Sequence, residues 1–145
     1  MDAYATHQHA LIEAALATTG DILELGSGDY STPLLSAIAK HRGNRLVIKS
    51  SDPVWADRFR DIAEVEIVDW ATWEPEGKYG LVFLDNEQLT SDRIKWIPKL
   101  AKIAKVIVMH DADAAMCSPE YESMTDGLDC VIHAKHTPWT AVFKC

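Results

Sequence analysis

The chain has 145 residues, of which 48% are hydrophobic, and its formal net charge is −8. This length supports one hydrophobic core and is too short for two ordinary domains, so we expect residues 1–145 to form a single domain. The acidic balance and the lack of a basic run argue against nucleic acid as a partner. The sequence shows neither a membrane span nor a signal-peptide pattern, so we predict a cytoplasmic protein with no membrane partner.

Short apolar segments alternate with helix-like ones, an order typical of a parallel sheet covered by helices on both faces. Five strands are predicted, at Asp21–Leu25, Arg45–Lys49, Glu64–Val68, Gly80–Leu84 and Lys105–Met109. Helices are predicted at residues 7–18, from Ser31-Thr32-Pro33 to about Lys40, around Val54–Ile62 and at Ser91–Ile103, and loops at Asp69–Lys78 and residues 112–127.

The end of the chain differs from the rest. Its two apolar runs, Cys130–Ala134 and Trp139–Phe143, are joined by a short connection containing Pro138, which predicts an antiparallel hairpin. We therefore predict an α/β fold with three layers, a Rossmann-like sandwich whose mostly parallel sheet ends in this C-terminal hairpin.

The cysteines give no sign of a disulfide framework or a metal site. Cys117, Cys130 and Cys145 form no CxxC pair, and Cys130 lies in an apolar run where we expect a small core residue. Two histidines near the N-terminus, His7 and His9, are expected on a solvent-facing side of the first helix.

Polar or glycine-rich residues follow the predicted strands, at the edge of a parallel sheet where ligands bind. After the first strand, the turn Gly26-Ser27-Gly28 lets the backbone pass close to a ligand, although such a turn also suits a simple tight connection. Asp52, just past the second strand, can accept hydrogen bonds from both hydroxyls of a ribose, and it equally suits a helix N-cap.

The remaining strand ends carry further polar groups. Asp69 and Trp70 follow the third strand, where the acid can bind an adenine amine and the Trp can cover the ring or pack on the surface. Asp85 follows the fourth strand, and His110 with Asp111 follows the fifth. The sequence thus brings potential ligands or bases to one edge of the sheet.

Four segments resemble motifs of the class I S-adenosylmethionine-dependent methyltransferases. They are ILELGSGDYSTPLL, IKSSDPVWADRF, YGLVFLDNEQ and WIPKLAKIAKVIVMHDAD. The resemblance covers roughly residues 7–113 in the same order and spacing, and it points to the small-molecule O-methyltransferase-like branch. It implies the class I methyltransferase fold and S-adenosylmethionine as cofactor. The third glycine common in the first motif is replaced here by Asp29-Tyr30.

The resemblance also implies the residues of a cofactor site. Glu24, Gly26 and Gly28 would shape its methionine end, Asp52 would bind the ribose, and Trp55 would flank the adenine. The full implied set is Glu24, Gly26, Ser27, Gly28, Asp52, Pro53, Val54, Trp55, Asp69, Trp70 and Asp85.

Catalytic residues are implied at the ends of strands four and five. The related catechol-type O-methyltransferases hold a divalent metal with acids at these places, which implies Mg²⁺ bound by Asp85 and Asp111. His110 is the implied general base, and the implied catalytic set is His110, Asp111 and Asp85. This chain has His and Asp where those enzymes carry an acid and an amide.

The predicted function is therefore methyl transfer from S-adenosylmethionine to the oxygen or nitrogen of a small-molecule acceptor. Two alternatives stay open: a non-catalytic binding protein with the same fold, and an enzyme that uses the pocket for other sulfonium chemistry. A dinucleotide site fits less well because Ser31 stands where GxGxxG requires glycine. The chain has little room for a lid, so we expect an open site or one covered by a second subunit of a homo-oligomer.

Overall fold

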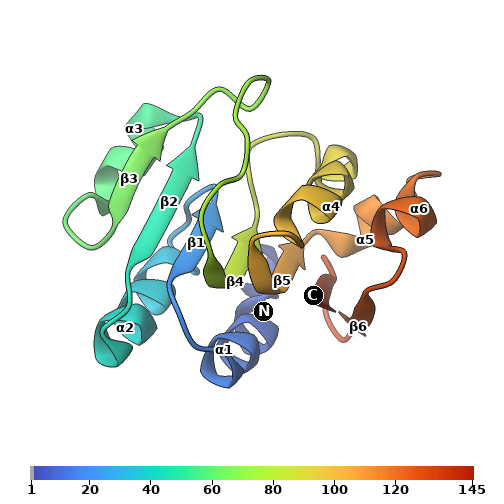
Figure 1. Cartoon of the computed structure of the whole chain (residues 1–145), viewed down its shortest axis with the longest axis horizontal. Helices are drawn as coiled ribbons and strands as arrows, with labels where there is room; N and C mark the ends of the chain where they lie inside the picture. The colour runs from blue at the N-terminus through green and yellow to red at the C-terminus, as the bar shows by residue number, and fades with distance from the viewer. Residues whose placement is uncertain (1) are drawn as a thin grey trace.

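Seven strands form one sheet in the computed structural model, which describes residues 2–145 (Figure 1). Across the sheet the order is β3-β2-β1-β4-β5-β7-β6. The strands are β1 (Ile22–Leu25), β2 (Leu46–Ser50), β3 (Glu64–Ile67), β4 (Tyr79–Leu84), β5 (Ala104–His110), β6 (Asp129–His133) and β7 (Thr140–Lys144). The first five strands are parallel, and β7 pairs antiparallel with both β5 and β6. The predicted parallel sheet and C-terminal hairpin are confirmed.

Helices cover both faces of this sheet, in three layers. The helices are η1 (Ala3–Ala5), α1 (Gln8–Ala17), α2 (Thr32–Arg42), α3 (Pro53–Ala56), η2 (Asp57–Phe59), η3 (Thr90–Trp96), α4 (Ile97–Leu100), α5 (Ala112–Met116) and α6 (Tyr121–Thr125). Figure 1 shows α1 and α2 together on one side, whereas α4, α5 and α6 gather at the other.

Each central strand is buried on both faces, so its side chains divide between two cores. Leu11 of α1 and Leu35 of α2 pack with Phe83 of β4 in one core. Leu100 of α4 packs with Ile107 of β5 in the other core. Side chains alternate along a strand, so residues two apart point to the same face of the sheet. This alternation determines on which face each residue at the carboxyl end of a strand lies.

The strand order places a switch point between β1 and β4. After β3 the chain returns to the other side of β1 to form β4, so the connections after β1 and β4 diverge to opposite sides. In an open parallel sheet, such a divergence leaves a crevice at the carboxyl ends of the strands. The sequence therefore directs the Gly26 turn and Asp85 to the two sides of one crevice.

Two segments differ from the sequence predictions. The helix expected at Ser91–Ile103 is a 3-10 helix, η3, followed by the short helix α4. Pro98 lies in the first turn of α4, where its missing N–H is tolerated, and an unbroken α-helix would have needed that N–H. The loop expected at residues 112–127 contains the two short helices α5 and α6.

Cys130 is exposed, as are Cys117 and Cys145, and all three are free thiols. The prediction of a core position for Cys130 was wrong because β6 is the outermost strand and carries mostly exposed side chains. An apolar run can have the same sequence pattern in an edge strand and in a buried central strand, because the pattern does not reveal how many neighbouring strands there are.

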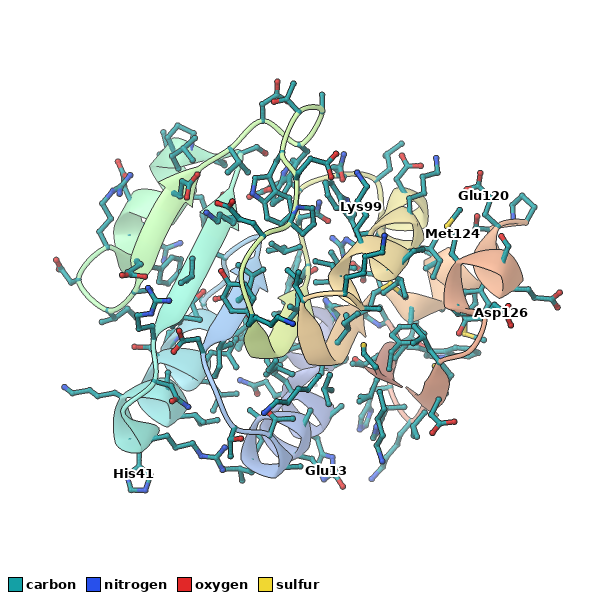
Figure 2. All side chains as sticks on the ribbon, viewed as in Figure 1. Glu13, His41, Lys99, Glu120, Met124 and Asp126 are labelled. Atoms are coloured by element: carbon teal, nitrogen blue, oxygen red, sulfur yellow. The ribbon has the colours of Figure 1, made fainter. Side chains whose placement is uncertain are left out.

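Polar side chains such as Glu13, His41, Lys99 and Glu120 extend outward from the helices and their ends (Figure 2). Within residues 2–145, none of the helices combines the length and the apolar character needed to cross a lipid bilayer.

Candidate functional site

The glycine turn after β1 lies directly against the end of β4. Gly26 has a φ of +84°, and a Cβ atom added there would lie 2.3 Å from the carbonyl oxygen of Asp85. The Gly26 N–H also donates to the carbonyl of Lys49 at the end of β2, at 2.8 Å. Only glycine fits this conformation and this close approach without displacing the backbone.

Glu24 of β1 supports this turn through hydrogen bonds with the residues that follow it. Its fully buried carboxyl group accepts hydrogen bonds from the Ser31 hydroxyl at 2.5 Å and the Thr32 hydroxyl at 2.8 Å. Burial raises the pKa of Glu24 to about 8, despite the opposing effect of those two hydrogen bonds. Glu24 therefore shapes the site through Ser31 and Thr32, because its own carboxyl group is covered.

A cavity of about 400 Å³ opens above the turn. Its walls come from the N-terminal segment, the glycine turn, α3 and the end of β4: Tyr4, His7, Ser27, Gly28, Asp29, Tyr30, Ser31, Trp55 and Asp85. The Trp55 indole N–H donates to the Ser27 carbonyl at 2.5 Å, which holds the indole against the turn. Ser27 Oγ is buried and has no hydrogen-bond partner among the side chains and backbone described.

Asp52 lies past the end of β2 and caps α3. One carboxylate oxygen, Oδ1, accepts the N–H of Trp55 at 3.0 Å, and Pro53 occupies the first turn, as expected for an N-cap followed by proline. Val54 is 82% exposed on the same short helix. The cap uses one carboxylate oxygen, so a ribose hydroxyl can still reach the other.

Trp70 is buried in an aromatic cluster next to the end of β3. Its ring meets Trp73 at a centroid distance of 5.5 Å and Trp96 at 5.9 Å, both edge-on. Asp69 remains exposed and accepts the N–H of Ala71 at 2.9 Å. Of the two residues expected near an adenine, Trp70 is thus committed to the core and Asp69 is the accessible one.

Glu87 is a polar residue at this edge that the sequence analysis did not single out. It reaches from the connection after β4 to the end of β2, where it accepts a hydrogen bond from Ser51 Oγ at 3.2 Å and another from the Ser50 hydroxyl. It also accepts the Trp70 indole N–H at 2.8 Å. Glu87 therefore ties β2, β3 and β4 together next to Asp52, and its position two residues after Asp85 was the only hint in the sequence.

A buried arginine separates the two acids that were expected to hold Mg²⁺. Arg93 Nη1 lies 2.8 Å from Asp85 Oδ1 and 2.6 Å from Asp111 Oδ2, and Nη2 donates to the Asn86 carbonyl at 2.8 Å. The guanidinium already supplies the positive charge between these carboxylates. Asp85 and Asp111 therefore do not fit a magnesium site, and that prediction is corrected.

His110 is the last residue of β5 and is only 4% exposed. Its Nδ1 lies 3.4 Å from Asp85 Oδ2, and its Nε2 lies 3.1 Å from the Thr6 hydroxyl. His7 and Asp85 line the cavity, whereas His110 lies behind them. His110 could therefore act on a molecule in this cavity only through His7 or Asp85.

The expectation that His7 faces solvent was wrong, because its ring is 2% exposed. The ring packs against Phe83 at a centroid distance of 4.8 Å and edge-on against His110 at 4.6 Å. Burial, reinforced by the nearby His110, lowers the pKa of His7 to about 4, so the imidazole is neutral at pH 7. His7 precedes the buried Leu11 by four residues, and this helical spacing was the available signal.

No family model and no curated protein matches the sequence. Solved structures do match the fold. Cofactor-bound Rv0187 from MTB aligns with a TM-score of 0.71 and 21% identity over 97% of this chain and 79% of that one. The O-methyltransferase TomG from Streptomyces achromogenes, in complex with S-adenosylmethionine, aligns with a TM-score of 0.68 and 15% identity. The alignment covers 94% of this chain and 78% of that one. An O-methyltransferase from Bacillus cereus, in complex with S-adenosylhomocysteine, aligns with a TM-score of 0.59 and 14% identity. The alignment covers 98% of this chain and 80% of that one. The chain thus has the class I methyltransferase fold.

Proposed function

We propose that residues 1–145 act as one domain that binds S-adenosylmethionine and transfers its methyl group to an oxygen or nitrogen of a small-molecule acceptor. The observation that carries this proposal is the cavity at the switch point between β1 and β4, in a fold shared with methyltransferases crystallised with this cofactor or its product. In such sheets this edge is where ligands bind.

The residues around the cavity suit the cofactor. Its methionine end would lie over Ser27 and Gly28, where the turn is free of bulky side chains and Ser27 Oγ lacks a partner among the residues described. Trp55 offers an aromatic surface for the nucleoside, and Asp52 offers a carboxylate oxygen for the ribose. Asp85, on the opposite wall, offers negative charge to the cofactor's ammonium group.

When bound, the cofactor supplies a sulfonium methyl group that is open to direct attack by a nucleophile. The protein's task is then to position the acceptor and exclude water. The neutral imidazole of His7 and the carboxylate of Asp85 both line the cavity and can help to position the acceptor's hydroxyl or amine. Because the Arg93 guanidinium lies between Asp85 and Asp111, acceptor activation in this proposal involves no magnesium ion.

A second candidate function is binding without transfer. It is favoured by the burial of His110 and by the pairing of both Asp85 and Asp111 with Arg93, which leave few free groups to activate an acceptor. The two functions share the cofactor site and differ only in turnover.

Calorimetric titration with S-adenosylmethionine, S-adenosylhomocysteine and NAD tests the shared part. We expect both sulfur nucleosides to bind one per chain and NAD to bind at least about 100-fold more weakly, a difference of about 2.7 kcal/mol. Binding of NAD alone would overturn the assignment. Release of S-adenosylhomocysteine in the presence of a panel of hydroxyl and amine acceptors then separates methyl transfer from binding alone.

A further inference from the structure

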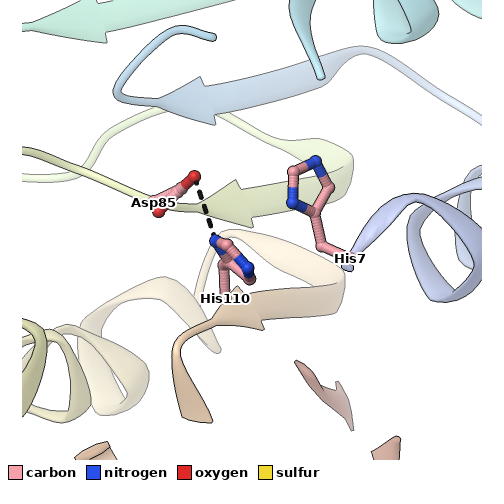
Figure 3. A group of neighbouring side chains, drawn as sticks. All are labelled: His7, Asp85 and His110. Carbon is pink, nitrogen blue, oxygen red and sulfur yellow. Dashed lines mark ion pairs between the residues drawn. The ribbon is translucent and has the colours of Figure 1, made fainter. Parts of the chain in front are cut away.

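Three side chains from distant parts of the sequence meet beside the cavity: His7 before α1, Asp85 after β4 and His110 at the end of β5 (Figure 3). One ligand atom from each lies within 4.8 Å of those of the other two. Both histidines are buried, and Asp85 is partly exposed. This group shares Asp85 with the Asp85–Asp111 pair that Arg93 bridges, but its two other members are histidines.

His7 indicates that something is bound here. Both of its ring nitrogens are buried, and neither has a hydrogen-bond partner among the atoms that the structure describes. A buried polar group left unpaired costs about 1–3 kcal/mol, so such a side chain calls for a ligand.

The contacts of His110 leave one of its nitrogens able to act as a ligand. The Thr6 hydroxyl has one proton, and the Pro138 carbonyl at 2.8 Å is the nearest of its contacts. With that proton directed to Pro138, Thr6 Oγ1 can accept a hydrogen bond from His110 Nε2–H, and this tautomer leaves the lone pair on Nδ1. In this tautomer the lone pair faces Asp85 Oδ2 at 3.4 Å, an arrangement that a cation bound between the two atoms would stabilise.

We propose that His7, His110 Nδ1 and Asp85 Oδ2 bind a divalent transition-metal ion such as Zn²⁺ or Fe²⁺. Two imidazoles and one carboxylate suit these ions, whereas Mg²⁺ prefers oxygen ligands. The ligands of a tetrahedral ion lie about 3–3.5 Å apart, so side-chain rotation must draw the group somewhat closer. The remaining coordination position would face the cavity, because His7 and Asp85 line it.

The surroundings of the three residues resemble those of ordinary metal sites. A histidine ligand usually donates its other ring N–H to a fixed acceptor, and Thr6 Oγ1, 3.1 Å from His110 Nε2, is placed to be that acceptor. A ligating carboxylate usually keeps a hydrogen bond on its second oxygen, as Asp85 does with Arg93 at 2.8 Å. Asp111 balances the charge of Arg93, so the guanidinium is not an isolated cation next to the ion.

Co²⁺ and Zn²⁺ titration of the chelator-treated full chain tests the proposal, with the Co²⁺ ligand-field spectrum and calorimetry as readouts. We expect one ion per chain and a visible band typical of nitrogen and oxygen ligation. His7→Phe should weaken Co²⁺ binding more than about 100-fold, and Thr6→Val about 10-fold, because partners outside the ligand set typically cost 10–100-fold. His9→Gln, an exposed position on α1, is the matched control and should change nothing.

A separate hollow of about 690 Å³ contains His9, His133 and His136, so it could bind metal ions adventitiously. The proposal is overturned if the chain binds no ion, or if binding survives His7→Phe and is lost when those three histidines are replaced by Gln. The site can also be tested without any substitution, by nitrogen NMR of the histidine rings in the unaltered protein. Zn²⁺ must shift His110 Nδ1 and one His7 nitrogen, and unchanged shifts refute the site. The titration is made without S-adenosylmethionine, so its result is independent of the proposed function.

Discussion

The glycine-turn side of the cavity and the β4–β5 side are assembled in different ways. Glu24 is held by Ser31 and Thr32, which follow it by seven and eight positions in one continuous segment. On the other side, Asp85 meets Arg93 from η3, His110 from β5 and His7 from the opposite end of the chain. The first side is a local structure, and the second exists only when the N-terminal segment, the segment from β4 to η3 and the end of β5 have folded together.

This difference predicts where the site is most sensitive. On the β4–β5 side, the charges balance only as a group, so the loss of one member leaves the others uncompensated. On the glycine-turn side, the space around Gly26 limits which side chains fit, and the buried carboxyl group of Glu24 is protonated at neutral pH. Substitutions on the two sides should therefore differ in size and in their dependence on ions and pH.

The largest effect is expected from Arg93→Met. Removing the guanidinium leaves Asp85 and Asp111 close together without a cation, which should lower the free energy of unfolding by about 3 kcal/mol or more. Urea unfolding at pH 7 measures this loss. Arg45→Met is the control, because the pair between Arg45 and Asp21 is exposed and should be worth less than about 1 kcal/mol.

The same variant tests why Mg²⁺ does not fit. In Arg93→Met the two carboxylates become available, so Mg²⁺ should raise the melting temperature of the variant and leave that of the unaltered protein unchanged. Equal stabilisation of both proteins by Mg²⁺ would show that Arg93 does not block a metal ion at Asp85 and Asp111.

Gly26→Ala should have the next largest effect, on the glycine-turn side. The new methyl group would lie 2.3 Å from the Asp85 carbonyl oxygen at a φ of +84°, so we expect a loss of about 2–3 kcal/mol, measured by urea unfolding. Gly127→Ala separates the two causes, because Gly127 has a φ of +77° and nothing within 4 Å of the added atom. It should cost only about 1 kcal/mol, from the backbone conformation alone. Equal losses in both variants would mean that the contact with Asp85 relaxes easily.

The pH dependence of stability should show the two sides acting in opposite directions. The pKa of Glu24 is raised to about 8, so the folded state holds a proton that the unfolded state has released, and stability falls as pH rises from 4.5 toward 8. The pKa of His7 is lowered to about 4, so the unfolded state holds the extra proton, and stability rises from pH 4 to 6.5. The two contributions to the free energy of unfolding cancel between pH 4.5 and 6.5. Above pH 6.5 only the contribution of Glu24 still changes with pH.

We therefore expect the free energy of unfolding to drop by about 2 kcal/mol between pH 6.5 and 8, from a slope of about 1.4 kcal/mol per pH unit. Chemical unfolding at a series of pH values measures it. Glu24→Gln should remove this drop and uncover the rise due to His7, whereas His7→Phe should extend the drop down to about pH 4.5. A drop that persists in Glu24→Gln would assign it to another group.

The contrast between local and distant construction also explains what the sequence could predict. The positions of the strands along the chain, the hairpin and the Gly26 turn follow from short-range patterns, because alternation, proline and glycine act within a few residues. Arg93 carries no such signal: it lies in a segment read as a helix, and only the return of η3 over the end of β5 brings it between Asp85 and Asp111. His7 was misplaced for a similar reason, since its burial depends on packing against β4 and β5.

The smallest effect on folding, and a clear one on affinity, is expected from Asp52→Ser. Serine caps a helix about as well as aspartate, so the stability of α3 should change by less than about 0.5 kcal/mol. The lost carboxylate would leave a ribose hydroxyl unpaired and weaken S-adenosylmethionine binding by about 1–3 kcal/mol in calorimetry. Asp57→Ser makes the same change of charge at a neighbouring exposed acid and should leave the affinity unaltered. If the two variants bind equally well, Asp52 serves only as the cap of α3. The ribose must then be held by another group at this edge, such as Glu87, which is bonded to Ser50 and Ser51.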